Sequence, residues 1–301
     1  MKILITGDHG TIGKELVKLL SEHEILGLDK AHEIIMDMNG NYMRLRRDIA
    51  DDSITEEVTE FKPELVFHLA ASFERTKESN EAFDHIFHND VLGSHKLIEA
   101  LKGINSVKTV IFASSYLIYK NVRQYVLREE SPIQPRNLCG YAKFYTEKEL
   151  EDVAAQQGWR HVNARIFRVY GSGGKEFLTA WCKAKAMSAS TAIFNANNSF
   201  DFIHARDVAH GLLAFATNSA AAGIINLGTG VSTSVKQIAE LIGNNPEKIL
   251  DDHEFYENSC ASTEKLWKIT GWKPEITIEQ GIKETLELEK QSLDHFSWKK
   301  N

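Results

Sequence analysis

The chain has 301 residues, of which 43% are hydrophobic and 26% are charged, and its formal charge is −7. This length is enough for one large α/β unit, or for a large domain with a smaller one attached. The charges are spread along the chain without a basic block, which excludes the usual signature of a nucleic-acid or membrane-surface partner. No apolar run approaches the length of a membrane-spanning helix.

The cysteines indicate the compartment. Cys139, Cys182 and Cys260 are odd in number and widely spaced, and a predicted strand begins directly after Met1, with no room for a targeting segment. This pattern favours reduced thiols in a cytoplasmic protein. It also argues against metal ligation, and we expect no metal site.

The start of the chain predicts a strand, a glycine turn and a helix. Ile3 to Ile5 form a short apolar run typical of a buried parallel strand. Three glycines follow at the spacing G-x-x-G-x-x-G: Gly7, Gly10 and Gly13. Such glycines permit a tight turn, a close approach to a pyrophosphate and helix-to-strand packing, whereas a plain loop is the alternative. Amide groups at the helix start, at Thr11 and Ile12, would then meet the phosphates.

A second predicted strand, from His23 to Asp29, supports the dinucleotide interpretation. It ends in the carboxylate of Asp29 about 20 residues after the glycines, where ribose hydroxyls need an acceptor. The same carboxylate repels a 2′-phosphate, so NAD is favoured over NADP. Lys30 partly offsets that repulsion and lies at the same strand end.

The next two predicted strands also end in residues that would contact the cofactor. Residues 42–49 predict a third strand, whose end, Asp48 and Ile49, would contact the adenine; a helix cap near Ser53 is an equally good role for Asp48. Residues 63–72 predict a fourth strand, in which His68 is interpreted as a packed core histidine. That strand runs into residues suited to a flat ligand, three for the cofactor and one for the substrate: Leu69, Ala70, Ala71 and Ser72.

The middle of the chain continues the alternation of strands and helices. Residues 83–102 predict a helix with a broad apolar face, and Asn89 within it is interpreted as a hydrogen-bonding anchor for a neighbouring strand or loop. The strand at 107–113 ends at Ser114 and Ser115, which should lie in the ligand crevice because parallel strands end at one edge. With a helix to about Gln156 and a strand at 159–167, the pattern predicts a Rossmann-type doubly wound parallel sheet of six or seven strands.

These landmarks resemble the extended short-chain dehydrogenase/reductase superfamily, in its NAD-dependent sugar-nucleotide epimerase/dehydratase group. The resemblance covers nearly the whole chain, and it is more specific for the fold than for the reaction. Its later landmarks are Tyr141, Arg165-x-x-x-Val169-Tyr170-Gly171, Asp201-Phe202-Ile203, Asn226-Leu227-Gly228-Thr229-Gly230 and Gly271-Trp272-Lys273-Pro274.

The resemblance implies a catalytic site. In this family the tyrosine of Y-x-x-x-K exchanges a proton with a sugar hydroxyl while NAD takes or returns the hydride, and a serine matching Ser115 shares the hydrogen bond. The lysine holds the nicotinamide ribose and lowers the tyrosine pKa. When Tyr141 is matched to that tyrosine, Tyr145 stands at the lysine position. Lys143 is then a poor substitute, because residues two apart point to opposite sides of a helix.

Two functions follow from this resemblance. One is an epimerase or 4-keto reductase that acts on a nucleotide sugar with altered proton handling by Tyr141, Ser115 and Tyr145. The other is a catalytically weakened nucleotide-sugar-binding or regulatory protein. Tyr116 and Arg168 are expected beside the substrate; Arg168 would bind its diphosphate, or else be a strand-end arginine paired with a surface carboxylate.

The same resemblance gives the expected organisation. Residues 1–168 and 200–243 would form the NAD-binding domain, and residues 169–199 and 244–301 a smaller substrate-binding lobe. A homodimer formed through the helices near residues 83–102 and 141–156 is implied as well.

Overall fold

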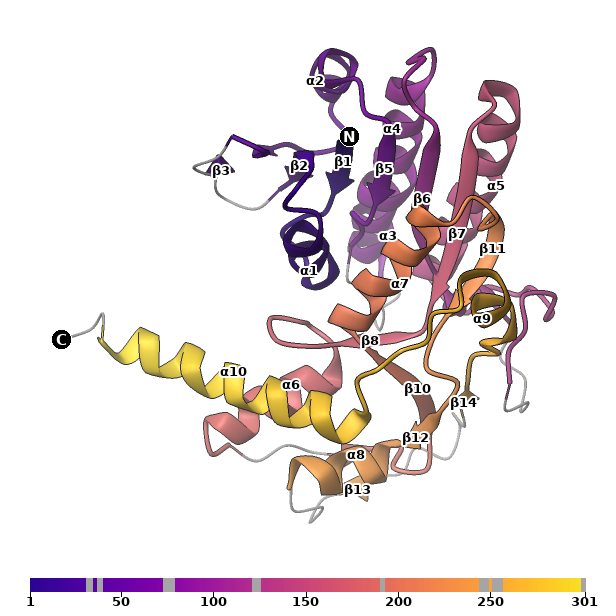
Figure 1. The fold of residues 1–301 in the computed structure, drawn as a ribbon. Helices are drawn as coiled ribbons and strands as arrows, with labels where there is room; N and C mark the ends of the chain where they lie inside the picture. Colours follow the sequence, from indigo (N-terminus) through magenta and orange to yellow (C-terminus); the bar gives the residue numbers. More distant parts are fainter. Residues whose placement is uncertain are drawn as a thin grey trace.

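The computed structural model describes residues 1–30, 35–36, 40–72, 79–120, 126–189, 193–243, 249–250 and 257–298. Eight strands form the main sheet in the order β11-β7-β6-β5-β1-β2-β4-β3, and only β3 runs antiparallel to its neighbour (Figure 1). The strands are β1 Lys2–Thr6, β2 Glu24–Asp29, β3 Ile35–Met36, β4 Tyr42–Arg46, β5 Leu65–His68, β6 Thr109–Ser115, β7 Arg160–Ile166 and β11 Gly223–Leu227. The predicted doubly wound parallel sheet is thus confirmed.

The order of the strands fixes the position of the ligand crevice. From β1 the chain winds outward through β2 to β4, then crosses back to β5 on the other side of β1. Ligands of such sheets bind outside the carboxyl ends of the strands at this reversal. The glycine turn after β1 and the small residues after β5 therefore lie at the same edge.

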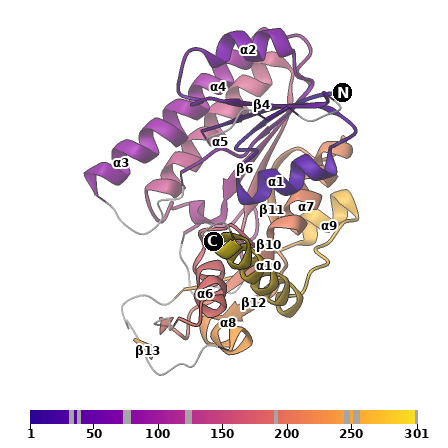
Figure 2. The same ribbon diagram turned by 90° about the vertical axis from the view of Figure 1, so that its left-hand side faces the viewer.

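Helices cover both faces of the sheet, as Figure 2 shows from the side. One face is covered by α1 Thr11–Leu19, α7 Ala205–Thr217 and α9 Glu264–Thr270, and the other by α2 Ile54–Phe61, α4 Gly93–Leu101 and α5 Leu138–Gln157. Successive residues of a strand point to opposite faces. Accordingly, Ile3 and Ile5 pack in the first core and Leu4 in the second, all fully buried.

The helix predicted at residues 83–102 consists of three segments. They are α3 Asn80–Ile86, a π-helical segment η1 Phe87–Leu92 and α4. Such π-helical insertions are frequent at functional sites. This one carries Asn89 and its neighbour Asp90 beside the crevice.

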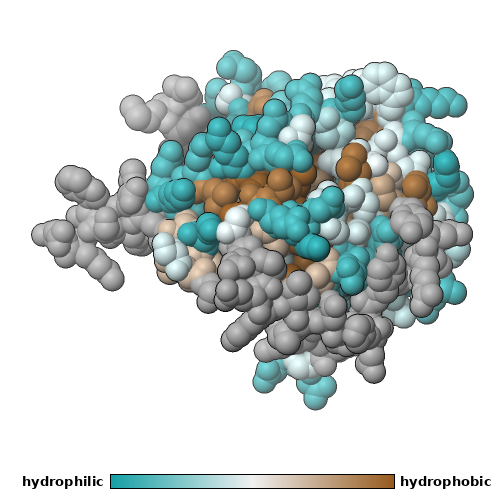
Figure 3. Space-filling model, turned by 90° about the horizontal axis from the view of Figure 1, so that it is seen from below, coloured by the Kyte–Doolittle hydropathy of each residue, from teal (hydrophilic) through white to brown (hydrophobic). Residues whose placement is uncertain are grey.

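A smaller lobe lies below the main sheet in Figure 1. Its elements are β8 Arg168–Tyr170, α6 Phe177–Ala186, β9 Ile193–Phe194, β10 Ser199–His204, β12 Ser232–Ser234, α8 Val235–Ile242, β13 Ile249–Leu250, β14 Asn258–Ser259 and α10 Ile278–Trp298. Seen from below, hydrophobic residues occupy the middle of this face and hydrophilic residues flank them (Figure 3).

The core of this lobe bears on the expected domain boundaries. Phe200 and Phe202 of β10 and Ile238 of α8 pack in one buried cluster with Leu178 of α6 and Ile282 of α10. The sequence analysis had placed residues 200–243 in the first domain. The packing of β10 and α8, and the pairing of β12 with β10, instead group these elements with the smaller lobe, while α7 packs on the main sheet and β11 is one of its strands.

Candidate active site

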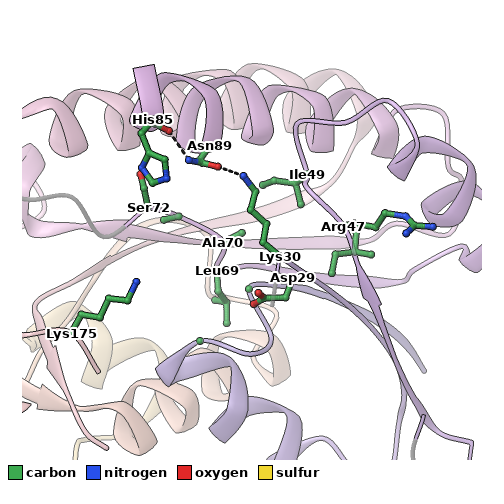
Figure 4. A pocket seen from close by; sticks show the side chains of 14 residues that line it. Asp29, Lys30, Arg47, Ile49, Leu69, Ala70, Ser72, His85, Asn89 and Lys175 are labelled. Atoms are coloured by element: carbon green, nitrogen blue, oxygen red, sulfur yellow. Dashed lines mark hydrogen bonds between the residues drawn. The ribbon is translucent and has the colours of Figure 1, made fainter. Parts of the chain in front are cut away.

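A cavity of about 270 Å³ opens at the carboxyl edge of the main sheet. It is shown in Figure 4. Its lining includes ten of the residues expected to bind the cofactor or substrate: Gly7, Gly10, Asp29, Lys30, Ile49, Leu69, Ala70, Ala71, Ser72 and Asn89. The cavity lining also includes Leu28, Arg47, His85 and Lys175, which the sequence analysis did not single out. Thr11, Ile12 and Gly13 lie just beyond, at the start of α1.

The glycine turn has the geometry of a dinucleotide cradle. Gly7 has φ +73°, and a Cβ there would lie 2.8 Å from the amide nitrogen of Ala70. A Cβ on Gly13 would lie 2.3 Å from the carbonyl oxygen of Gly7. Any side chain at either position would force these segments apart. The bare backbone leaves room for a pyrophosphate at the start of α1, so the residues fit NAD.

A buried ion pair between Asp8 and Arg44 stabilises this turn. Asp8 Oδ2 accepts a hydrogen bond from Arg44 Nε at 2.7 Å and another from the Tyr42 hydroxyl. The absence of a side chain at Gly27 makes room for the carboxylate, since a Cβ there would lie 2.3 Å from Asp8 Oδ2. Burial, with the hydrogen bond to Asp8, raises the pKa of Tyr42. The pair ties the glycine turn to β4.

The acidic and basic groups at the ends of β2 and β4 hold one another in place. Asp29 Oδ2 accepts from the amide of His9 at 3.1 Å. Lys30 Nζ lies 2.6 Å from Asp48 Oδ2 and also donates to Asn89 Oδ1. Burial alone would raise the pKa of Asp48, but the hydrogen bonds from Lys30 and from the amide of Ala50 outweigh it and keep that pKa below its usual value.

These contacts bear on two predictions made from the sequence, those for Asn89 and Asp48. Asn89 anchors the end of β2 through Lys30, as the sequence analysis predicted for it. Asp48 does not cap α2: its oxygens bind Ala50, Lys30 and the ring of His88.

His68 is a core residue, as expected. Its ring nitrogens lie 2.7 Å from Thr6 Oγ1 and 2.8 Å from Ser94 Oγ, and its ring stacks on Phe112 with the centroids 5.2 Å apart. Burial, together with the positive charge of Lys143, lowers the pKa of His68 to about 3. The ring is therefore neutral at physiological pH and is held by hydrogen bonds.

The side chains of Asp90 and Lys143 are buried beside the cavity. Asp90 Oδ1 accepts from the amide and hydroxyl of Ser72, at 2.6 and 2.7 Å. Lys143 is 6% exposed and places its Nζ 4.6 Å from the centroid of the Phe112 ring. Burial raises the pKa of Asp90, and the positive charge of Lys143 opposes that rise. Ser72 thus connects Asp90 to the cavity.

The end of β6 lies against the start of α5. Ser114 donates to Glu147 of α5, and Ser115 Oγ accepts from the amide of Leu117 at 3.2 Å. A Cβ on Gly140 would lie 2.7 Å from the carbonyl oxygen of Leu117, so this approach also requires a glycine. Tyr116 begins a short 3-10 turn, η2 Tyr116–Ile118; its ring is buried and stacks on Phe167. Tyr116 is therefore a packing residue in this structure and not an exposed substrate contact.

The exposed and buried faces of helix α5 differ from those expected from the sequence. Tyr141 and Tyr145 are 58% and 49% exposed. Cys139 and Lys143, one helical turn apart, are 5% and 6% exposed. The spacing argument holds, because Tyr141 and Lys143 do lie on opposite faces. However, the face that carries the lysine is the one turned to the sheet, which does not support Tyr141 and Tyr145 facing the sugar with Ser115.

Arg168 has partners within the protein. Its Nη1 lies 2.8 Å from Glu176 Oε1, and its guanidinium lies 3.7 Å from the centroid of the Phe200 ring. Glu176 also accepts from the amide of Phe177 at the start of α6. This arrangement agrees with the alternative given above in that Arg168 pairs with a carboxylate, but the carboxylate of Glu176 is buried and not at the surface.

One group of possible metal ligands occurs among the described residues. His95, Glu99 and Glu149 bring their ligand atoms within 4.8 Å of one another on the surface of α4 and α5. The ring of His95 already forms a hydrogen bond with Glu149, which accounts for their contact.

The sequence analysis did not single out Asp8, Asp90 and Lys175, and it set Lys143 aside as a poor substitute for the family lysine. A signal for Lys143 was present: Asn137 accepts from the amide of Gly140 at 2.9 Å and begins the helix at Leu138, three residues before Tyr141. Counted from that start, Cys139 and Lys143 share a face. Asp8 and Asp90 directly follow the predicted site residues Gly7 and Asn89, whereas Lys175 becomes a neighbour of the site only through tertiary packing.

The sheet, the glycine cradle and the carboxylate of Asp29 define a class: parallel α/β proteins that bind a dinucleotide at the carboxyl edge of the sheet. A family model for the NAD-dependent epimerase/dehydratase family matches residues 3–228. The chain belongs to this family, within the extended short-chain dehydrogenase/reductase superfamily, and its cofactor is NAD. Among the described residues, no helix has the length and hydrophobicity needed to cross a membrane.

Several known proteins resemble the chain along nearly its whole length. A UDP-glucose 4-epimerase of Mycolicibacterium smegmatis is 26% identical, over 95% of this chain and 98% of that protein. A GDP-6-deoxy-D-mannose reductase of Pseudomonas aeruginosa is 25% identical, over 95% and 96%. The structure of a UDP-glucose 4-epimerase of Thermotoga maritima with UDP-glucose superposes with a TM-score of 0.85, 25% identity, and coverage of 97% of this chain and 100% of that one.

Proposed function

We propose that the protein oxidises and reduces a carbon of a nucleotide sugar with NAD, as in 4-epimerisation or 4-keto reduction. The family and the relatives named above support the substrate class. The observation that carries the proposal is the buried Lys143 on the inner face of α5, beside the end of β6 and next to Asp90 and His68.

Our assignment of the catalytic helix differs from the one made on the sequence. Lys143 takes the place of the family lysine and holds the nicotinamide ribose, and Cys139, one turn earlier, stands where the family has its tyrosine. Cys139 shares a buried cluster with Tyr116, Leu117 and Phe167. Tyr141 and Tyr145 are then outside the reaction, on the opposite face of the helix.

With NAD bound, the cofactor supplies hydride transfer, and the residues of the chain position the reactants. The backbone of the glycine turn binds the pyrophosphate, and Asp29 accepts from the adenosine ribose. Ser115, at the end of β6, donates to the sugar hydroxyl that gains or loses its proton. Lys143 fixes the nicotinamide end of the cofactor by its charge and hydrogen bonds.

Cys139 favours a second candidate function. A thiol is a shorter side chain and a weaker hydrogen-bond donor than a phenol. Proton exchange at the sugar hydroxyl, which the family assigns to its tyrosine, is therefore poorly supported at this position. The second candidate is a member of the family that binds NAD and a nucleotide sugar but transfers hydride slowly, as a binding or regulatory protein.

Absorbance of the purified protein near the NADH band tests both candidates. Bound NAD that becomes reduced when UDP-glucose or another nucleotide sugar is added supports the redox function. NAD that stays oxidised with every nucleotide sugar, together with faster reduction in Cys139→Tyr, supports the second candidate. Reduction that is abolished by Tyr141→Phe contradicts our assignment of the helix faces.

We also infer that the protein forms a homodimer through α3, η1 and α5. The supporting observation is a patch of exposed aromatic side chains on these three segments, which we call the aromatic patch: Phe83, Phe87, Tyr141 and Tyr145. The rings of Phe83 and Phe87 stack with their centroids 6.0 Å apart. Apolar surface of this kind is usually covered by a partner.

A further inference from the structure

Lys175 belongs to the smaller lobe, yet it lines the cavity at the edge of the main sheet. It lies in the loop between β8 and α6, and its side chain extends into the cavity from the side of the glycine turn, opposite His85 and Asn89 (Figure 4).

The loop that carries Lys175 lies directly against the start of α1. A Cβ placed on Gly171 would lie 3.7 Å from the side chain of Thr11, and one placed on Gly174 would lie 3.7 Å from Thr11 Oγ1. Thr11 is the first residue of α1, whose amide groups face the pyrophosphate position. Lys175 is thus next to the place where the two phosphates of the cofactor come to lie.

Hydrogen bonds on both sides of Lys175 hold the loop in place. Glu289 of α10 accepts from the hydroxyl of Ser172 at 3.0 Å and from the amide of Gly173 at 3.1 Å. The amide of Gly174 bonds to the carbonyl of Gly171, also at 3.0 Å. On the other side, Glu176 is fixed by Arg168. The backbone of Lys175 is therefore positioned before any ligand binds, which reduces the entropy lost on binding.

The charges that line the cavity indicate which kind of ligand Lys175 can bind. Three cationic side chains line the cavity, Lys30, Arg47 and Lys175, and each of them interacts with other groups of the protein. Asp29 adds a negative charge to the lining. A diphosphate entering this cavity brings negative charges that the cationic side chain of Lys175 can stabilise from the opposite lobe.

We propose that Lys175 binds the diphosphate of the dinucleotide and so connects the smaller lobe to the cofactor. The ligand is the diphosphate of NAD and not the diphosphate of the sugar nucleotide, because Lys175 shares its cavity with Gly7 and Gly10. The proposal adds a residue from the second lobe to the NAD site formed by the glycine turn.

Calorimetric titration of the full chain with NAD, ADP-ribose and UDP tests the proposal. The Lys175→Ala variant is expected to bind NAD and ADP-ribose about tenfold more weakly, because one charge-assisted contact is lost. Its affinity for UDP is expected to be unchanged. Lys175→Arg is expected to retain most of the affinity. The matched control is Lys183→Ala, an exposed lysine of the same lobe that does not line the cavity.

Three results would overturn the proposal. They are an unchanged NAD affinity in Lys175→Ala, an equal loss in Lys183→Ala, or a loss confined to UDP, which would assign Lys175 to the sugar-nucleotide diphosphate. Thermal unfolding of each variant without ligand checks that the fold is retained. Binding of NAD by the unsubstituted chain tests the cofactor itself, independently of Lys175.

Discussion

The imidazole of His68 is buried in the middle of the parallel sheet, where it has two hydroxyl partners and an aromatic neighbour. A protonated ring there would lack water and would lie close to the positive charge of Lys143. Both effects favour the neutral ring. The residue therefore links the stability of the sheet to pH without taking part in proton transfer.

We expect His68→Gln to make the stability of the protein less sensitive to acid. The pKa of His68 is about 3 in the folded state and near 6.5 in the unfolded chain, so its stabilising contribution is complete above about pH 6.5 and is lost as the pH falls toward 3. Within this window the free energy of unfolding of the wild type should fall, as the pH is lowered, by up to about 1.4 kcal/mol per pH unit more than that of the variant. Urea unfolding at several pH values measures this, and equal slopes for the two proteins would refute it.

At the scale of the element, α5 is held to the sheet by buried polar contacts. Arg165 Nη2 lies 2.7 Å from Glu147 Oε2, Nε lies 3.0 Å from Oε1, and both side chains are 1% exposed. Ser114 donates to the same carboxylate. These contacts join α5 to the ends of β6 and β7 and so determine which face of the helix is turned to the sheet.

Removal of this charge pair should be costly. Glu147→Gln leaves the guanidinium of Arg165 buried without its counter-charge, and we expect the free energy of unfolding to fall by about 3 kcal/mol or more. Glu151→Gln on the same helix, which breaks an exposed pair with Lys148, should change it by less than about 0.5 kcal/mol. Comparable losses in chemical denaturation would mean that the buried pair does not anchor the helix.

The same contacts explain why our proposed assignment of this helix differs from the one made on the sequence. The inner face of α5 carries Lys143, Thr146 and Glu147, while its outer face carries Tyr141 and Tyr145. Hydrophobic periodicity therefore gives no indication of the buried face, and the tyrosine was matched to a motif without structural support. In β1 and β5, by contrast, continuous apolar runs identified buried strands correctly.

At the scale of the whole molecule, the fold was predictable where the local pattern and the sheet topology agree. The glycine turn, Asp29 and the residues after β5 were all expected at one edge, because parallel strands place their carboxyl ends together. Lys175 reaches the cavity through packing of a distant loop, and the π-helical segment places Asp90 against Ser72 in the cavity lining; no sequence period encodes either arrangement. The assignment of α8 to the smaller lobe likewise depends on contacts with α6 and α10.

The proposed dimer can be tested by a charge placed on the aromatic patch. Phe87 is 51% exposed, and Phe87→Glu should convert a wild-type dimer into a monomer because it places a carboxylate in an apolar contact. Trp267→Glu on α9, an equally exposed aromatic residue outside the patch, should leave the dimer intact. Light scattering after size exclusion gives the masses, and a monomeric wild type would contradict the proposal.

The central claim is that the face of α5 with Lys143, and not the face with Tyr145, meets the cofactor. Binding of NAD and of ADP to Lys143→Met and Tyr145→Phe tests it most directly, because ADP lacks the nicotinamide ribose. We predict that Lys143→Met lowers the affinity for NAD about tenfold and leaves the affinity for ADP unchanged. Tyr145→Phe is predicted to alter neither affinity. Weaker NAD binding in Tyr145→Phe, with unchanged binding in Lys143→Met, would contradict the account.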